Sequence, residues 1–135
     1  MTEKLNTLWE LTLTIESLNP DEYRVDDLGA IIKKSDYGKK TMFGWTIDHI
    51  FPLSKGGDDN IRNLQLLHWE NNLLKGNDFP TYNWNTSRNR NSDTIENITI
   101  PRPKITFRAS FVESLADLYP SILQYRVSPL GALML

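Results

Sequence analysis

The sequence predicts an α+β fold. Three observations favour this class: a run dense in aromatic and β-branched residues at 43–51, a second apolar run at 63–67, and a segment at 68–75 that contains neither glycine nor proline. The first two are typical of strands and the third is typical of a helix. A chain of 135 residues buries roughly two-thirds of its unfolded surface, so it can fold around a core of its own.

The residues before this core, 1–40, are expected to form a helical lead-in. Apolar residues between positions 3 and 18 fit a helix, although three of them alternate as they would in a strand. Pro20, followed by two acidic residues, ends this segment and predicts the first turn of a new short helix. The stretch DDLGAIIKK at 26–34 then reads as a short segment that packs under the core.

The core itself reads as strand, loop, strand and helix. The run FGWTIDHIF at 43–51 is a strand that Pro52 ends, because proline cannot donate to a ladder. The loop at 53–60, LSKGGDDN, combines glycines, which accept positive φ, with aspartates, which bond nearby amides. The strand NLQLL follows at 63–67, and a helix at about 68–75 is closed by a glycine.

Beyond the core we expect a β-hairpin and a last helix. Apolar and polar residues alternate at 82–86 and again at 95–100, with a loop rich in Asn, Ser and Arg between them. Apolar residues at helical spacing predict the helix at 109–119, where Ser110 and Glu113 match a capping box.

These segments are expected to form a single domain. Its parts are the lead-in 1–40, the core at about 43–79, the hairpin and helix at 80–120, and a tail at 121–135 that ends in the apolar run SPLGALML.

Composition limits the class of protein. No apolar run is long enough to span a membrane, and MTEKLNTLWELTLTIE lacks the order of a secretory signal, so we expect a soluble, cytoplasmic protein. The chain has no cysteine, which excludes disulfides and thiolate metal ligands. The net charge is −2, but residues 37–112 hold ten Lys and Arg against seven Asp and Glu. A polyanionic partner therefore fits the middle of the chain.

The spacing of polar residues in the core is specific. An Asp-His pair ends the first strand, an Asn follows fourteen residues after the His, and a second Asn, nine residues further on, precedes a Lys by three positions. An Asp-His pair alone would say little, but this order on these elements is rarely met by chance. The segment 43–79 resembles the HNH endonuclease family, the ββα-metal or His-Me finger fold, and in particular its zinc-free bacterial subset.

The resemblance implies a role for each of four residues. His49 would be the general base, since a neutral imidazole can accept a proton from water at physiological pH. Asp48 and Asn72 would hold a divalent cation, and Asn63 would complete the catalytic set by bracing the loop. Adjacent residues on a regular strand point to opposite faces, so Asp48 and His49 can serve one site only if the strand bends or ends there.

Basic residues near this set are candidates for contact with nucleic acid. Lys55 and Arg62 flank the loop, and Lys75 lies one helical turn past Asn72, where it would meet a phosphate. Further basic residues that would extend a groove are Arg88, Arg90, Arg102, Lys104 and Arg108.

The residue types favour Mg²⁺ or Mn²⁺ as the cofactor, because carboxylate and amide oxygens suit hard cations. Many relatives carry two Cys-x-x-Cys pairs around a structural zinc, and this chain has His68 and Asn71 where the second pair would fall. No structural zinc is expected, and His68 is interpreted as a packed or capping side chain.

The resulting hypothesis is a metal-dependent endonuclease that hydrolyses phosphodiester bonds in duplex or nicked DNA. Two alternatives stay open. One is a catalytically silent module on the same fold that binds nucleic acid or a protein, and the other is a nuclease that acts on RNA or as a toxin effector.

Overall fold

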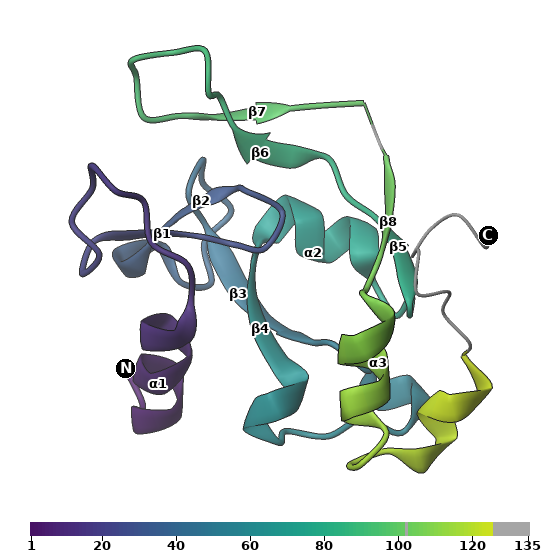
Figure 1. The fold of residues 1–135 in the computed structure, drawn as a ribbon. Coiled ribbons are helices and arrows are strands. Elements are labelled where there is room, and N and C mark those ends of the chain that lie inside the picture. Colours follow the sequence, from purple (N-terminus) through teal and green to yellow (C-terminus); the bar gives the residue numbers. More distant parts are fainter. Residues whose placement is uncertain (102, 126–135) are drawn as a thin grey trace.

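The computed structural model describes residues 1–101 and 103–125, which form three α-helices, four short 3-10 helices and eight short strands (Figure 1). The strands pair into four antiparallel two-stranded sheets. This mixture of helices and small sheets is the α+β class that the sequence predicts. Arg102 and residues 126–135, with the apolar end of the predicted tail, lie outside the described residues.

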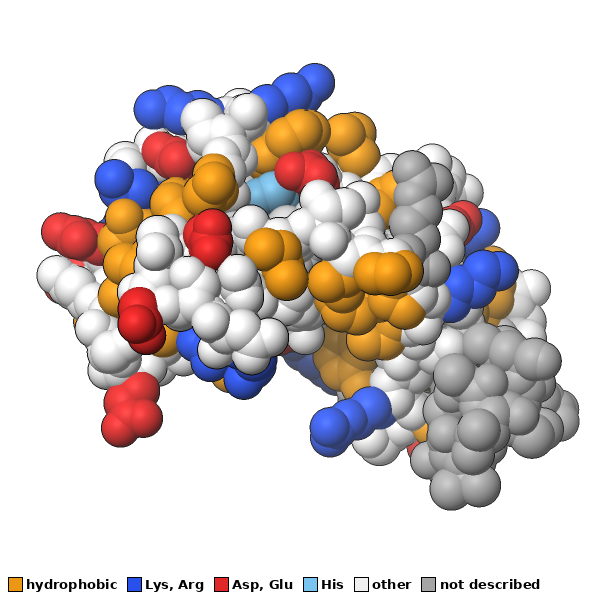
Figure 2. Space-filling view, turned by 90° about the horizontal axis from the view of Figure 1, so that it is seen from above, with side chains coloured by type: hydrophobic (Ala, Val, Ile, Leu, Met, Phe, Trp, Pro, Cys, Tyr) orange, Lys and Arg blue, Asp and Glu red, His pale blue; other side chains and the backbone are white. Residues whose placement is uncertain are grey.

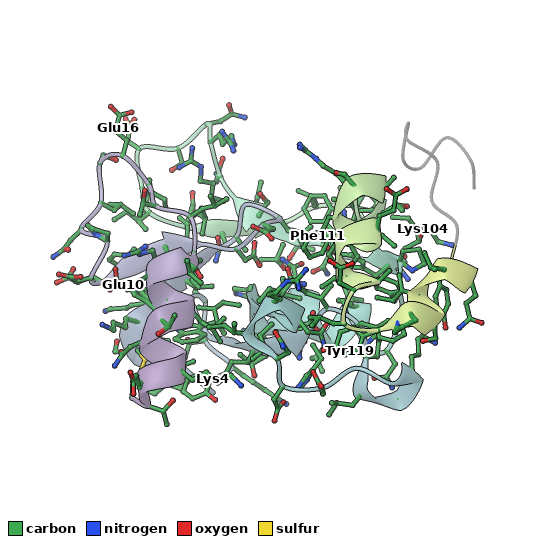
Figure 3. The ribbon with its side chains drawn as sticks, turned by 60° about the horizontal axis from the view of Figure 1, so that its bottom comes forward. Lys4, Glu10, Glu16, Lys104, Phe111 and Tyr119 are labelled. Atoms are coloured by element: carbon green, nitrogen blue, oxygen red, sulfur yellow. The ribbon has the colours of Figure 1, made fainter. Side chains whose placement is uncertain are left out.

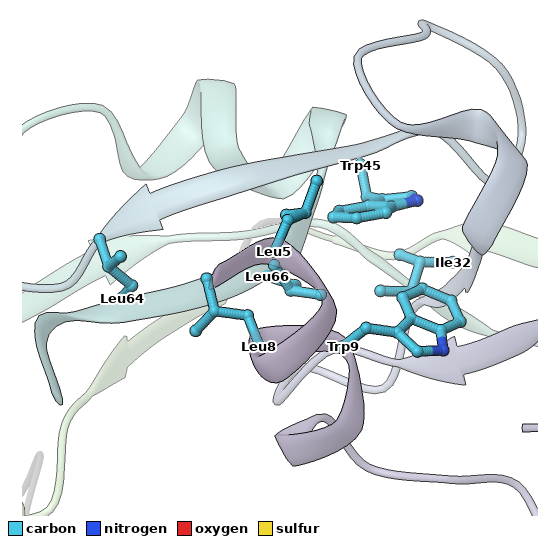
Figure 4. Close-up of a cluster of buried hydrophobic side chains, with 7 residues drawn as sticks. All are labelled: Leu5, Leu8, Trp9, Ile32, Trp45, Leu64 and Leu66. Atoms are coloured by element: carbon cyan, nitrogen blue, oxygen red, sulfur yellow. The ribbon is translucent and has the colours of Figure 1, made fainter. Parts of the chain in front are cut away.

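The centre of the molecule is the hairpin of β3 (Trp45–His49) and β4 (Leu64–His68), followed directly by α2 (Trp69–Lys75). These are the strand, strand and helix expected for the core, and Gly76 closes the helix with a positive φ of 52°. Helix α2 packs on one face of the hairpin, and α1 (Glu3–Leu11) covers the other (Figures 1 and 4). The hairpin is therefore held between two helices.

One of the hydrophobic core clusters fills the space between α1 and the hairpin. Figure 4 shows the side chains of α1 meeting those of the strands around two buried tryptophans, Trp9 and Trp45, whose ring centroids are 5.5 Å apart. The members of this cluster are Leu5, Leu8, Trp9, Ile32, Trp45, Leu64 and Leu66. Burial of these side chains fixes the face of β3 that points toward α1, and so also the face that points toward α2.

The lead-in is only partly helical, and the expectation of a second short helix after Pro20 is wrong. Helix α1 ends at Leu11, and the chain then forms the hairpin of β1 (Tyr23–Val25) and β2 (Ile31–Lys33). The strand-like alternation after residue 11 prevails because Leu13 forms a bridge to Val25. The carboxylate of Asp26 accepts backbone N–H bonds from residues 28 and 30, which closes the turn between the two strands.

The predicted hairpin beyond the core is present as a longer two-part arm. Strand β6 (Thr86–Arg88) pairs with β7 (Asn97–Thr99), and further along the arm β5 (Thr81–Asn83) pairs with β8 (Lys104–Thr106). Strand β8 was not predicted from the sequence, because the prolines at 101 and 103 interrupt the apolar alternation that would have marked it.

The last helix, α3 (Ala109–Leu115), is present, but the capping box is wrong. Arg108 is the N-cap residue, and no side chain bonds the first turn, because the helix begins one residue before Ser110. A 3-10 helix, Pro120–Gln124, follows. Figure 3 shows Lys4 and Glu10 on α1, and Phe111 and Tyr119 on the opposite side of the molecule, beside α3. No helix within residues 1–101 and 103–125 has the length and hydropathy needed to cross a bilayer.

Candidate active site

The end of β3 and the outer face of α2 enclose an open hollow of about 330 Å³. Asp48, His49 and Asn72 all line it, although the two strand residues are sequence neighbours. This is geometrically allowed because β3 ends at His49 and the chain bends at residues 50 and 51. The other lining residues are Ile47, Pro52, Leu53, Leu73, Gly76 and Asn77.

The imidazole of His49 is oriented by a loop carboxylate. Its Nε2 lies 2.6 Å from Oδ1 of Asp59, and its side chain is 26% exposed. The backbone carbonyl of Asp59 in turn accepts a bond from the Lys4 ammonium group. In neutral His49, a proton on Nε2 donates to Asp59 and leaves the lone pair on Nδ1. Sequence reasoning missed Asp59, and its only signal was a second aspartate in the loop.

The loop that carries Asp59 is held in place by Asn63, which is fully buried. The Asn63 amide oxygen accepts from Phe51 N–H at 2.7 Å, and its Nδ2 donates to the carbonyls of Phe51 and Asp58 at 3.0 Å each. These are the loop-bracing bonds expected of Asn63, and none of them reaches the hollow. Gly57 is required beside them, because a Cβ atom there would lie 1.8 Å from the Phe51 carbonyl oxygen.

Asp48 is buried and its carboxylate is paired. Oδ2 lies 3.3 Å from the Lys75 ammonium nitrogen and accepts a 2.9 Å bond from Gln65 Nε2, which stands opposite on β4. Burial raises the pKa of Asp48 and the charge of Lys75 opposes that shift. Burial likewise lowers the pKa of Lys75, against the charge of Asp48.

The expectation that Lys75 meets a phosphate on the surface does not hold in this structure. Its side chain is 0% exposed, and its ammonium group also donates to the backbone carbonyls of His49 at 3.1 Å and Ile50 at 3.3 Å. The helical spacing was right, but the face of α2 that carries Lys75 packs against β3 rather than facing solvent.

Asn72 is half-buried, and its side-chain amide makes no hydrogen bond within residues 1–101 and 103–125. Together with Asp48 it offers oxygen donors at the hollow. Within the described part of the chain, no group of three or more His, Asp or Glu side chains is placed to hold a metal. One carboxylate and one amide oxygen are hard donors, which suit a divalent cation that keeps several of its waters.

His68 and Asn71, the residues that the resemblance sets at the place of a second cysteine pair, belong to a buried hydrogen-bond network. His68 is the N-cap of α2: its Nδ1 accepts from Glu70 N–H and its Nε2 bonds the Met42 carbonyl. The capping role predicted for His68 is thus confirmed. Asn71 bonds the backbone of residues 85 and 86 through three contacts.

Asp26 joins this network to the lead-in. Its Oδ2 accepts from His68 N–H at 3.0 Å and from Asn71 Nδ2 at 3.2 Å. Complete burial raises the pKa of Asp26 to about 6, against the lowering effect of its hydrogen bonds. The network connects the β1–β2 turn, the start of α2 and the arm through direct hydrogen bonds.

The other basic candidates differ in their surroundings. Lys55 is exposed on the 3-10 helix Leu53–Lys55, next to the rim of the hollow. Arg62 donates to the Ser114 carbonyl at 2.8 Å and lies 4.0 Å from Asp117, so its guanidinium group is engaged with α3. Figure 2 shows Lys and Arg side chains spread around the margin of one face, with apolar side chains between them.

Comparison with known protein families supports the resemblance. A family model described as HNH endonuclease matches residues 32–78, about a third of the chain, and this segment contains β3, the loop, β4 and α2. No curated protein and no solved structure matches the chain. HNH domains are generally nucleases that act on nucleic acid with a divalent metal.

Proposed function

We propose that this protein is a metal-dependent endonuclease that hydrolyses phosphodiester bonds in DNA, with β3, β4 and α2 as a ββα-metal core within one domain. The observation that carries the proposal is the hollow at the end of β3, which brings Asp48, His49 and Asn72 together inside the segment that matches the HNH family. Asp48 and Asn72 are 24 positions apart in the chain, and the packing of α2 on the hairpin brings both to the same hollow.

His49 acts as the general base in this proposal. Asp59 holds the imidazole through Nε2, so Nδ1 accepts the proton of the attacking water. The carboxylate also stabilises the imidazolium that forms when the proton is transferred. Asn63 contributes by position: it fixes the loop that carries Asp59 and so fixes the angle of the His49 ring.

Asp48 and Asn72 hold the cation, with Mg²⁺ or Mn²⁺ favoured by their oxygen donors. When bound there, a divalent cation supplies positive charge for the phosphate and the leaving oxygen. Lys55, exposed at the rim, contacts the phosphate backbone of duplex or nicked DNA beside the hollow.

One observation favours the catalytically silent alternative. The carboxylate expected to bind metal is already paired with the buried ammonium group of Lys75. A silent module would bind DNA in this hollow and leave it uncut with any divalent cation, so the two functions differ in one measurable product.

Plasmid nicking tests the proposal. Purified protein with Mg²⁺ or Mn²⁺ is expected to convert supercoiled plasmid to nicked circles, and EDTA is expected to stop it. His49→Ala and Asn72→Ala should each lower the rate by about 100-fold or more, whereas Asn91→Ala, exposed on the arm, should not. Equal cutting by the His49 variant would show that His49 is not the general base, and undiminished cutting in EDTA would show that the reaction needs no divalent metal.

His68→Ala would not be a matched control for His49→Ala, because His68 caps α2 from a buried position and its loss would disturb the fold. The substrate class is tested by parallel digests of duplex DNA, single-stranded DNA and single-stranded RNA. Preferential cutting of RNA would replace the DNA endonuclease with the ribonuclease alternative.

A further inference from the structure

The ammonium group of Lys75 lies next to Asp48 of the candidate site but cannot reach solvent. It contacts three successive residues at the end of β3: the carboxylate of Asp48 and the backbone carbonyls of His49 and Ile50, at 3.3, 3.1 and 3.3 Å. An ammonium group has three N–H donors, so these contacts use all of them. A buried cation of this kind is retained only where it is fully paired.

This pairing determines what Asp48 can offer to a ligand. Oδ2 already receives Lys75 and Gln65, and Oδ1 has no hydrogen bond from any of the described residues. Asp48 lines the hollow, so it presents one free carboxylate oxygen there. Any ion bound by Asp48 is held through a single oxygen while Lys75 stays in place.

The charges of the site add to the same conclusion. Asp48 carries one negative charge, Lys75 carries one positive charge, and the amide of Asn72 is neutral. The described part of the chain has no cluster of further acidic or histidine ligands at this position. Asp48, Asn72 and Lys75 together therefore carry no net negative charge with which to attract a free divalent cation, whereas a phosphodiester in the hollow would add one negative charge.

We propose that Lys75 is a built-in counter-ion of Asp48 that keeps the affinity of the free protein for divalent cations low, so that cation and phosphodiester are taken up together. This rests on the proposed function for the identity of the ligands. Lys75 is a positioning residue in this scheme, since it contacts neither substrate nor cation. Because the two ligands bind together, the cation occupies the site only when the phosphodiester substrate is also bound.

Binding of Mn²⁺ alone to the full chain, followed by electron paramagnetic resonance, tests the proposal without turnover. Lys75→Gln keeps a donor for the backbone carbonyls but removes the charge, and it should bind Mn²⁺ at least about tenfold more tightly than the natural chain. Lys40→Gln removes a charge from an exposed position outside the hollow and should leave the affinity unchanged. Adding Asp48→Asn to Lys75→Gln should abolish the gain.

Equal affinity of the natural chain and Lys75→Gln would overturn the proposal, as would a gain of the same size in Lys40→Gln. Circular dichroism shows whether Lys75→Gln is folded, and a second measurement does not need that variant. In His49→Ala, which retains Asp48, Lys75 and Asn72, Mn²⁺ should tighten binding of a short DNA duplex, measured by fluorescence anisotropy, at least tenfold more than it does in His49→Ala with Asp48→Asn. Binding linkage requires this reciprocity.

Indifference of duplex binding to Mn²⁺ would overturn the coupling even if the plasmid is cut. Conversely, if the plasmid is not cut but the Mn²⁺ affinities are as expected, the nuclease proposal is refuted and the counter-ion role of Lys75 is retained. The two proposals therefore fail by different measurements.

Discussion

His49 and Asp59 are joined by a 2.6 Å hydrogen bond although ten positions separate them in the chain. The bond crosses the loop between β3 and β4, so the geometry of the proposed base depends on how that loop is folded. The loop is in turn held by the buried side chain of Asn63. Orientation of the base, bracing of the loop and the turn at the end of β3 thus form one structural unit.

Asp59→Asn should lower the rate of plasmid nicking by about tenfold with little change in substrate affinity, because the imidazole loses the carboxylate that orients it and stabilises its charged form. The rate and duplex affinity are measured separately, by nicking and by anisotropy in EDTA. Asp21→Asn, an exposed aspartate outside the hollow, is the matched control. A normal rate in Asp59→Asn would mean that the bond to His49 does not serve catalysis.

Asn63→Ala should lower the free energy of unfolding by about 2 to 4 kcal/mol, because it leaves a buried N–H of Phe51 and two carbonyls without their partner. Urea denaturation followed by tryptophan fluorescence measures this. Asn91→Ala, at an exposed position, should change the free energy by less than about 0.5 kcal/mol. A loss in Asn63→Ala no larger than in this control would contradict the bracing role.

The stability of the protein should fall as pH rises from about 4 to about 6 through the titration of Asp26. Its pKa is about 6 in the folded protein against an ordinary value of 3.8. Between these values the folded state binds more protons than the unfolded state, so the free energy of unfolding decreases with rising pH and becomes level above the window.

The difference in unfolding free energy between the natural chain and Asp26→Asn isolates this group, since the amide does not titrate. The unfolding free energy of the natural chain minus that of Asp26→Asn should decrease by about 1 to 2 kcal/mol from a pH of about 4.5 to about 6.5. Urea titrations at both values provide it. A constant difference would show that Asp26 titrates outside this window.

Removal of divalent metal should not change the thermal midpoint of unfolding. Direct hydrogen bonds of His68, Asn71 and Asp26 hold the start of α2 to the β1–β2 turn and to the arm, where a structural zinc would otherwise be needed. Circular dichroism melts before and after dialysis against EDTA measure the midpoint. A fall of several degrees on chelation, restored by Zn²⁺ but not by Mg²⁺, would reveal a structural zinc that the network does not explain.

The core was predictable because its signals are local. The aromatic and β-branched run between 43 and 51 marks β3, which ends at His49, three residues before the proline, and a glycine ends the helix. The lead-in was harder to predict because α1 ends where Leu13 pairs with Val25, a contact between residues that no local pattern connects. The false capping box arose in the same way: Ser110 and Glu113 have the right spacing, but the N-cap is Arg108, two residues before Ser110.

For the site, the sequence by itself determined which residue types stand at which intervals: Asp48, His49, Asn63 and Asn72, in the order found in the segment that matches the HNH family. Only the tertiary structure decided their surroundings. The packing of α2 on β3 buried Lys75 against Asp48, and the folding of the loop brought Asp59 to His49. Spacing along the chain fixes which side chains share an element, whereas charge pairing and burial depend on which faces of different elements meet.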